Sequence, residues 1–168
     1  MKASDIVVVS AQLGADTVGD DLFFKLTQNA VTLVGAELAR HIRDGERPGV
    51  LSPLEVVIDG KDRLGAILVL EDRAILAWTI GTLRMRNFEE VIPLAAVTDA
   101  VTGERPRGVM TKARDTLTIY AGKTWHVVFA NTDRGRPIAP FIAGLLVGAI
   151  KPVFRDGDDP AEPSDPSS

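Results

Sequence analysis

The stretch of sequence that decides the fold is residues 64–94, which read LGAILVLEDRAILAWTIGTLRMRNFEEVIPL. It contains three apolar runs, separated by the charged residues 71–73 and by Gly81. The first run is continuously apolar and short, which is typical of a strand covered on both faces, although a buried helical piece has the same pattern. The sequence predicts three successive strands, at residues 66–70, 74–80 and 83–94.

The third run changes its pattern midway. Leu83 and Met85 would point to one face of a strand, with arginines on the other face. The apolar residues after Asn87 do not continue this alternation. Side chains alternate between the two faces with a period of two, and an inserted residue shifts that pattern. We therefore predict a bulge or sharp bend near Asn87.

Further short extended segments lie on either side of this stretch. They are residues 50–58, 97–101, 116–121 and 124–130. Asp59 and Gly60 follow the first of them, and this residue pair favours the two-residue turn of a β-hairpin. Gly122 and Lys123 separate the last two, which are also predicted to form a hairpin. The side chains that we expect to be largely buried are Leu68, Leu70, Leu76, Ile92, Leu117, Ile119, Val127 and Phe129.

Two apolar helices are predicted outside the strands. The first runs from Asp21 to about Arg43, with acidic residues at its start and basic residues at its end, as the helix dipole favours. The second begins at Pro137 or Pro140 and runs to Ile150. A first helical turn tolerates proline well. Both helices carry wide apolar stripes, so we expect each of them to be covered.

The final helix is apolar on all of its faces and therefore needs cover beyond the strands. Gly144 and Gly148 lie one turn apart and would allow another backbone to approach closely. We expect the N-terminal helix to pack on this surface, with a second subunit as the alternative. The candidate interface residues are Phe141, Gly144, Leu145 and Gly148.

Composition limits the function classes. The 168-residue chain has a formal net charge of −4, whereas a dedicated nucleic-acid binder would be basic. It has no cysteine, which excludes disulfides, thiolate metal sites and cysteine nucleophiles. The apolar run at residues 6–9 is too short for the core of a signal peptide. No run approaches the roughly 20 apolar residues of a membrane-spanning helix, so we expect a cytoplasmic protein.

The sequence contains no motif of a catalytic or cofactor-binding site. Its serines lack the context of a nucleophile elbow. Glu89 and Glu90 are adjacent, so in a strand they would point to opposite faces and could not act as a facing pair. His41 and His126 do not have the spacing of metal ligands. We therefore expect no enzymatic activity, no bound metal and no cofactor.

A basic loop is predicted at residues 103–114, between two of the strands. Such a loop could bind the phosphate groups of a lipid head group or, alternatively, an acidic peptide. A charge run is more often simply a solvated surface. The candidate ligand-binding residues are Arg105, Arg107, Lys112 and Arg114.

The order of these elements, several short antiparallel strands and then one apolar helix, resembles that of the bacterial pleckstrin-homology-like (PH-like) domains. The resemblance covers residues 54–153. It rests on VLEDRAIL at residues 69–76, which is similar to a strand, charged turn and strand of that family, and on IPLAAV at residues 92–97, which is similar to the step before its next strand. It implies an α+β fold with an antiparallel β-barrel of about seven strands, capped by a C-terminal helix.

Three parts are predicted along the chain. They are an N-terminal helical extension that packs on the barrel (residues 1–49), the PH-like barrel with its capping helix (50–155) and a disordered acidic tail (156–168). The leading functional hypothesis is a non-catalytic binding or assembly module that acts through protein contacts, with a protein partner or by self-association. We expect a homo-oligomer and no nucleic-acid partner. The alternative is a peripheral protein that binds anionic lipid head groups weakly through the basic loop.

Overall fold

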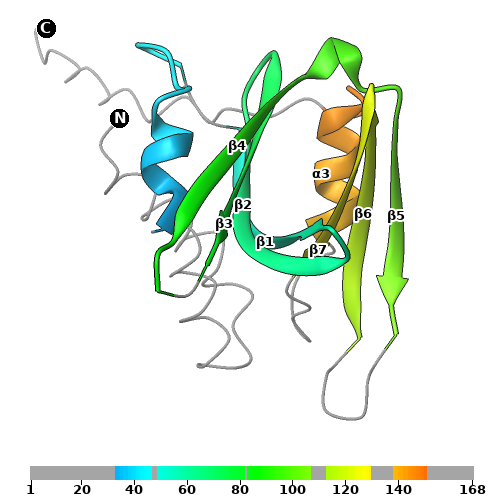
Figure 1. Ribbon diagram of the computed structural model, residues 1–168. Coiled ribbons are helices and arrows are strands. Elements are labelled where there is room, and N and C mark those ends of the chain that lie inside the picture. The colour runs from blue at the N-terminus through cyan, green and yellow to red at the C-terminus, as the bar shows by residue number, and fades with distance from the viewer. Residues whose placement is uncertain (1–32, 47–48, 82, 107–112, 130–137, 151–168) are drawn as a thin grey trace, which may run out of the picture.

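The computed structural model describes residues 33–46, 49–81, 83–106, 113–129 and 138–150. In this part of the chain seven strands form one antiparallel sheet, in the order β4-β3-β2-β1-β7-β6-β5 (Figure 1). The strands are β1 (Val50–Ile58), β2 (Lys61–Val69), β3 (Arg73–Ile80), β4 (Arg86–Pro93), β5 (Asp99–Arg105), β6 (Arg114–Ala121) and β7 (Lys123–Phe129). The helices are a segment at residues 33–39, the short η1 (Leu94–Ala96) and α3 (Ile138–Leu146). The predicted α+β class and the predicted number of strands are confirmed.

Some predictions fall on residues outside this description. They are the first part of the N-terminal helix, at residues 21–32, and the acidic tail, at residues 156–168. Among the described residues, no helix has both the length and the apolar character needed to cross a membrane.

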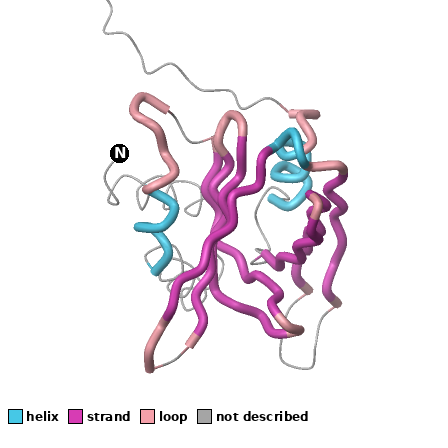
Figure 2. The backbone as a smooth tube through the Cα atoms, turned by 45° about the horizontal axis from the view of Figure 1, so that its top comes forward, coloured by secondary structure: helices cyan, strands magenta, loops and turns pink. Residues whose placement is uncertain are grey.

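Apolar side chains pack on both faces of the sheet, which explains the continuous apolar run in β2. Successive residues of a strand point to opposite faces. Ile67 packs with Phe129 and with α3 in what we call the inner core. Its neighbour Leu68 packs with Leu38 of the helical segment 33–39 in what we call the outer core. Figures 1 and 2 show the two helices on opposite sides of β1–β4.

The buried residues were largely predictable from strand alternation. All eight side chains that we expected to be buried are at most 3 % exposed. They divide between the two cores, because Leu68 and Leu70 belong to the outer core and the other six to the inner core.

The predicted packing of the N-terminal helix is wrong for the part that the structure describes. Val34 and Leu38 contact the outer face of the sheet, against Leu68 and Ile75, and not the outer face of α3. The physical reason is that the outer face of β1–β3 is itself strongly apolar and requires cover. α3 packs on the other face, where it contacts β5, β6 and β2.

The predicted bulge near Asn87 is also wrong. β4 pairs with β3 in an unbroken register, from Pro93 opposite Arg73 to Arg86 opposite Ile80. The pattern shift has a different cause: β4 begins at Arg86, and the preceding residues belong to the turn after Gly81. The residues before Arg86 therefore do not obey the period of a strand.

The first hairpin turn is as predicted. Asp59 has a φ of 50° and Gly60 a φ of 70°, and the flanking residues Ile58 and Lys61 are paired. Positive φ at both central residues is the requirement of the two-residue turn that matches strand twist. This turn sets the register of β1 and β2 over their whole length.

Candidate interaction surface

Exposed apolar residues gather at one edge of the sheet. β4 pairs with β3 on one side and with no other described strand. Four large apolar side chains lie on β4 or in the turn before it: Leu83 is 98 % exposed, Met85 53 %, Phe88 42 % and Val91 40 %. We call residues 83–93 the β4 edge. An uncovered apolar edge strand is a template for pairing with another chain.

The pairing of β4 with β3 determines which backbone N–H and C=O groups of the β4 edge point away from the sheet. The N–H of Leu94 donates to the carbonyl of Asp72 at 2.9 Å. Bonded and non-bonded pairs alternate along an antiparallel ladder, so the odd-numbered residues of β4 direct their N–H and C=O groups away from β3. Pro93 is one of these odd-numbered residues. Its missing N–H would point away from β3, so the proline removes no hydrogen bond from the sheet. The residues that present backbone groups at the edge are Asn87, Glu89 and Val91.

Aromatic and ionic contacts hold the inner face of the β4 edge. The ring of Phe88 stacks on Trp78 of β3, with 6.0 Å between centroids. Trp78 in turn lies 5.5 Å from the ring of Trp125 on β7. Lys123 of β7 forms an ion pair with Glu90 at 3.3 Å. These contacts connect β3 and β4 to β7 by side chains, although no backbone pairing joins them.

The N-terminal helical segment supports the outer face of the same edge. The side-chain amide of Asn87 donates to the carbonyl of Leu33 at 2.7 Å. Glu89 lies 3.3 Å from the guanidinium of Arg40 and 3.2 Å from the ring of His41. The β4 edge is thus held by β3 and on both of its faces, and its outward side remains uncovered by the described residues.

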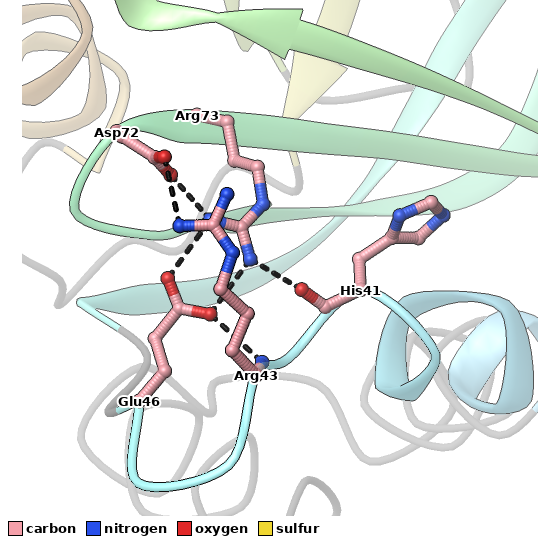
Figure 3. Close-up of polar contacts among 5 residues, drawn as sticks. All are labelled: His41, Arg43, Glu46, Asp72 and Arg73. Carbon is pink, nitrogen blue, oxygen red and sulfur yellow. Dashed lines mark hydrogen bonds and ion pairs between the residues drawn. The ribbon is translucent and has the colours of Figure 1, made fainter.

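A buried arginine fixes the end of this helical segment to the start of β3 (Figure 3). The guanidinium of Arg73 donates to both carboxylate oxygens of Glu46, at 2.9 and 2.6 Å. It also donates to the backbone carbonyl of His41 and to the carboxylate of Asp72. Arg43 bonds Asp72 through its side chain at 3.0 Å and Glu46 through its backbone N–H at 2.9 Å. We call these five residues the Arg73 clasp.

The clasp stabilises the charged forms of its members. Burial opposes the ionisation of Glu46, but hydrogen bonds from Arg73 and from the Arg43 N–H outweigh it and lower the pKa of Glu46. The hydrogen bond from Arg73 also lowers the pKa of Asp72, and the bond to Glu46 raises the pKa of Arg73. All three are therefore charged at neutral pH. The clasp is a satisfied ionic network that positions the helical segment.

Sequence reasoning did not identify this clasp. It placed Arg73 in a turn, whereas Arg73 is the first residue of β3 and only 8 % exposed. The sequence did contain a signal, because Arg73 directly precedes a fully apolar run. A charged residue at such a position is rarely buried without a partner of opposite charge. The partner Glu46 lies 27 residues away, and no local pattern connects the two.

The basic loop is shorter than predicted, and its described cations are paired. β5 extends to Arg105 and β6 begins at Arg114, so these two residues belong to strands and lie opposite each other. Arg105 forms an ion pair with Asp62 at 2.6 Å. Arg114 bonds the carboxylate of Glu55 and the carbonyl of Phe129. The other two predicted ligand-binding residues, Arg107 and Lys112, lie outside the described residues.

The chain itself covers two of the four predicted interface residues on the final helix, Gly144 and Leu145, whereas Phe141 and Gly148 are exposed. α3 stops before Ile150, its predicted last residue, and Gly148 has the positive φ, 72°, of a helix terminator. The side chain of Ile150 folds back over Gly144 and comes within 2.5 Å of the position that a Cβ would take there. Leu145 is buried in the inner core. Phe141 is 41 % exposed.

Comparisons with known proteins give one structural similarity. No family model matches the sequence, and no curated protein matches it. Among solved structures, the chain is similar to the hSac2 domain from the human phosphoinositide phosphatase Sac2. The TM-score is 0.47 at 14 % sequence identity, and the match covers 71 % of this chain and 79 % of that chain.

The prediction that the chain is not an enzyme needs correction. The solved structure reported above is a domain of a phosphoinositide phosphatase. The exclusion rested on the lack of recognisable motifs in the sequence, and such a lack is weak evidence, because active sites are recognised by geometry and not by sequence position.

Proposed function

We propose that this protein is a binding or assembly module that acts through protein contacts at the β4 edge, on a scaffold of the PH-like barrel type. The scaffold assignment is supported by the order of the described elements, seven antiparallel strands followed by α3. It is also supported by the contacts of Trp78 with Trp125 and of Glu90 with Lys123, which bring the two parts of the sheet together.

The observation that carries the proposal is the composition of the β4 edge. Natural edge strands are usually protected by charges, bulges or covering segments. Here Met85, Phe88 and Val91 are each at least 40 % exposed, and the outward backbone groups of β4 pair with no other described strand. β5, at the other end of the sheet, has one such side chain, Val101, among its described residues. The asymmetry favours β4 as a surface that another protein covers by adding a strand.

The lipid alternative has less support. Arg105 donates to Asp62 and Arg114 to Glu55, so two of the four cations of the loop already have carboxylate partners within the chain. A cation that pairs internally contributes less to the attraction of an anionic membrane. Any lipid binding would therefore depend on Arg107 and Lys112.

Photo-crosslinking tests the proposal directly. A photoreactive phenylalanine analogue is placed at position 88, and in a matched control at position 101 on β5, where Val101 is also exposed. The proteins are irradiated in the cells that produce them, and adducts are sized by mass spectrometry. We expect protein adducts from position 88 and few from position 101.

A vesicle-binding assay tests the lipid alternative. Vesicles of phosphatidylcholine with phosphatidylserine are sedimented with the protein at low and moderate salt. Binding that disappears in the Arg107→Gln, Lys112→Gln variant, together with no adduct at position 88, would overturn the proposal in favour of the lipid alternative. Equal adduct yields at positions 88 and 101 would also contradict it.

A further inference from the structure

We infer that the occupant of the β4 edge is a second copy of this chain, paired strand to strand, antiparallel, about a twofold axis at Phe88. This inference rests on the proposed function and identifies the partner. It follows from the symmetry of such a pair and from the charges along the strand, and the direction of the outward backbone groups agrees with it.

Symmetry allows only a few registers. When two identical edge strands pair antiparallel in one continuous sheet, the twofold axis is perpendicular to the sheet and the contact is the same on both copies. Residues that face each other across an antiparallel pair lie on the same face of the sheet. One residue must therefore face its own copy, and the axis passes midway between these two residues. For the middle of the β4 edge, the choices are Asn87, Phe88 and Glu89.

Charge selects among these three registers. An axis at Glu89 sets this carboxylate against itself, and like charges directly opposite are destabilising. An axis at Asn87 places Arg86 opposite Phe88 of the second copy, so this cation faces an apolar ring and no opposite charge. An axis at Phe88 places Arg86 opposite Glu90 of the second copy, and symmetry repeats this pair.

The register at Phe88 also matches the apolar residues. Phe88 faces Phe88 of the second copy. Phe88 is 42 % exposed in the single chain. Aromatic pairs and opposite charges are the cross-strand pairs that stabilise antiparallel sheets. In this register the ring of Phe88 meets its own copy, and Arg86 meets Glu90.

The backbone fits the same register. The N–H and C=O groups of Asn87 and Glu89 point outward from β4, as the bond from Leu94 to Asp72 shows. With the axis at Phe88, Asn87 faces Glu89 of the second copy, so the two outward-directed residues form a bonded pair. Phe88 then forms a non-bonded pair with its copy, the geometry in which facing side chains come closest.

The existing contacts leave room for the second copy. Glu90 is bound by Lys123, but its side chain retains 33 % exposure and can accept a further bond from an arginine. Arg86 is exposed and has no ion pair among the described residues. Phe88 uses one ring face against Trp78 and is 42 % exposed elsewhere.

Disulfide trapping tests the register, and the chain is suited to it because it contains no cysteine. Facing residues of a non-bonded pair are about 4.5 Å apart between Cα atoms, within the range that a disulfide spans. We expect Phe88→Cys to oxidise to a covalent dimer under mild oxidant. Val101→Cys on β5 is the matched control and should remain a monomer at the same concentration.

A second pair of variants covers the case in which Phe88→Cys does not fold. An equimolar mixture of Arg86→Cys and Glu90→Cys should give the mixed dimer, whereas each alone should give little dimer, because position 86 does not face itself. Failure of the mixture to cross-link, or equal cross-linking of Val101→Cys, would overturn the inference. The proposed function is judged separately: an adduct at position 88 with the mass of a different protein would leave it standing and still contradict the second copy.

Discussion

Arg73 and Glu46 form a two-point ion pair, Nη1 to Oε1 at 2.9 Å and Nη2 to Oε2 at 2.6 Å, with side chains 9 % and 10 % exposed. The pair connects the first residue of β3 to the segment that follows the N-terminal helical residues. That helical segment supports the outer face of the β4 edge through Glu89 and Asn87. The ion pair therefore contributes to the shape of the proposed binding surface from a distance.

Removal of the arginine should be strongly destabilising. Arg73→Ala leaves the Glu46 carboxylate buried without its partner, and such a loss costs about 3–5 kcal/mol in the free energy of unfolding. Arg43→Ala is the matched control, because Arg43 and Asp72 are more than half exposed. That change should cost at most about 1 kcal/mol. Urea unfolding of both variants measures the difference. Equal effects would show that the clasp acts no differently from a surface ion pair.

The clasp should also make stability depend on pH in the acid range. The folded state lowers the pKa of Glu46 below its ordinary value of 4.5. The unfolded state therefore takes up a proton first, and the contribution of Glu46 is complete above about pH 4.5 and is lost as pH falls through the lowered pKa. Glu46→Gln removes this titration. We expect the stability gap between wild type and Glu46→Gln to be constant above that pH and to shrink below it.

A gap that stays constant down to the acid limit of folding would contradict this account. Asp72 and the two arginines of the clasp are present in both proteins, so their own titration is shared by the two curves. Unfolding by urea at a series of pH values gives the comparison.

Two phenylalanines give a matched test of the core assignment. Phe129 is 1 % exposed in the inner core and Phe141 is 41 % exposed on α3. Phe129→Ala should lower the free energy of unfolding by about 3–5 kcal/mol. Phe141→Ala should lower it by at most about 2 kcal/mol, because much of its ring is in water already. A larger loss at Phe141, or dissociation of an oligomer in that variant, would show that α3 is an interface after all.

The sequence predicted those parts of the fold that are set by neighbouring residues. Asp59 and Gly60 specify their turn through their tolerance of positive φ, so this hairpin could be placed before the structure was known. Alternation in β6 and β7 identified Leu117 and Phe129 as core residues for the same local reason.

Other features depend on contacts between distant segments, and the sequence did not predict them. The run in β2 indicated cover on both faces, but it could not tell which helix lies on which face. Both helices are apolar enough to pack on either face. The clasp joins Glu46 to Arg73, and neither residue has a local pattern that indicates the other.

The β4 edge was missed for a specific reason. Leu83 and Met85 were counted as strand residues, so their exposure in the turn was not expected. Once β4 is placed from Arg86, the exposed residues and the outward backbone groups form a single surface. The proposed pairing of Arg86 with Glu90 of a second copy uses this surface. Strand pairing has to be known before this surface can be recognised.

Charge exchange at positions 86 and 90 tests the central claim most directly. In the proposed dimer, Arg86→Glu places a carboxylate opposite Glu90 of the second copy at both symmetric contacts. Glu90→Lys places a cation opposite Arg86 of the second copy at both. Each variant alone should self-associate at least about tenfold more weakly than wild type. In an equimolar mixture, both pairs become attractive again. Sedimentation velocity should then show a monomer for each variant alone and a mixed dimer for the mixture. A wild-type chain that remains monomeric at all concentrations, or a mixture that stays as monomeric as its components beside a dimeric wild type, would contradict the account.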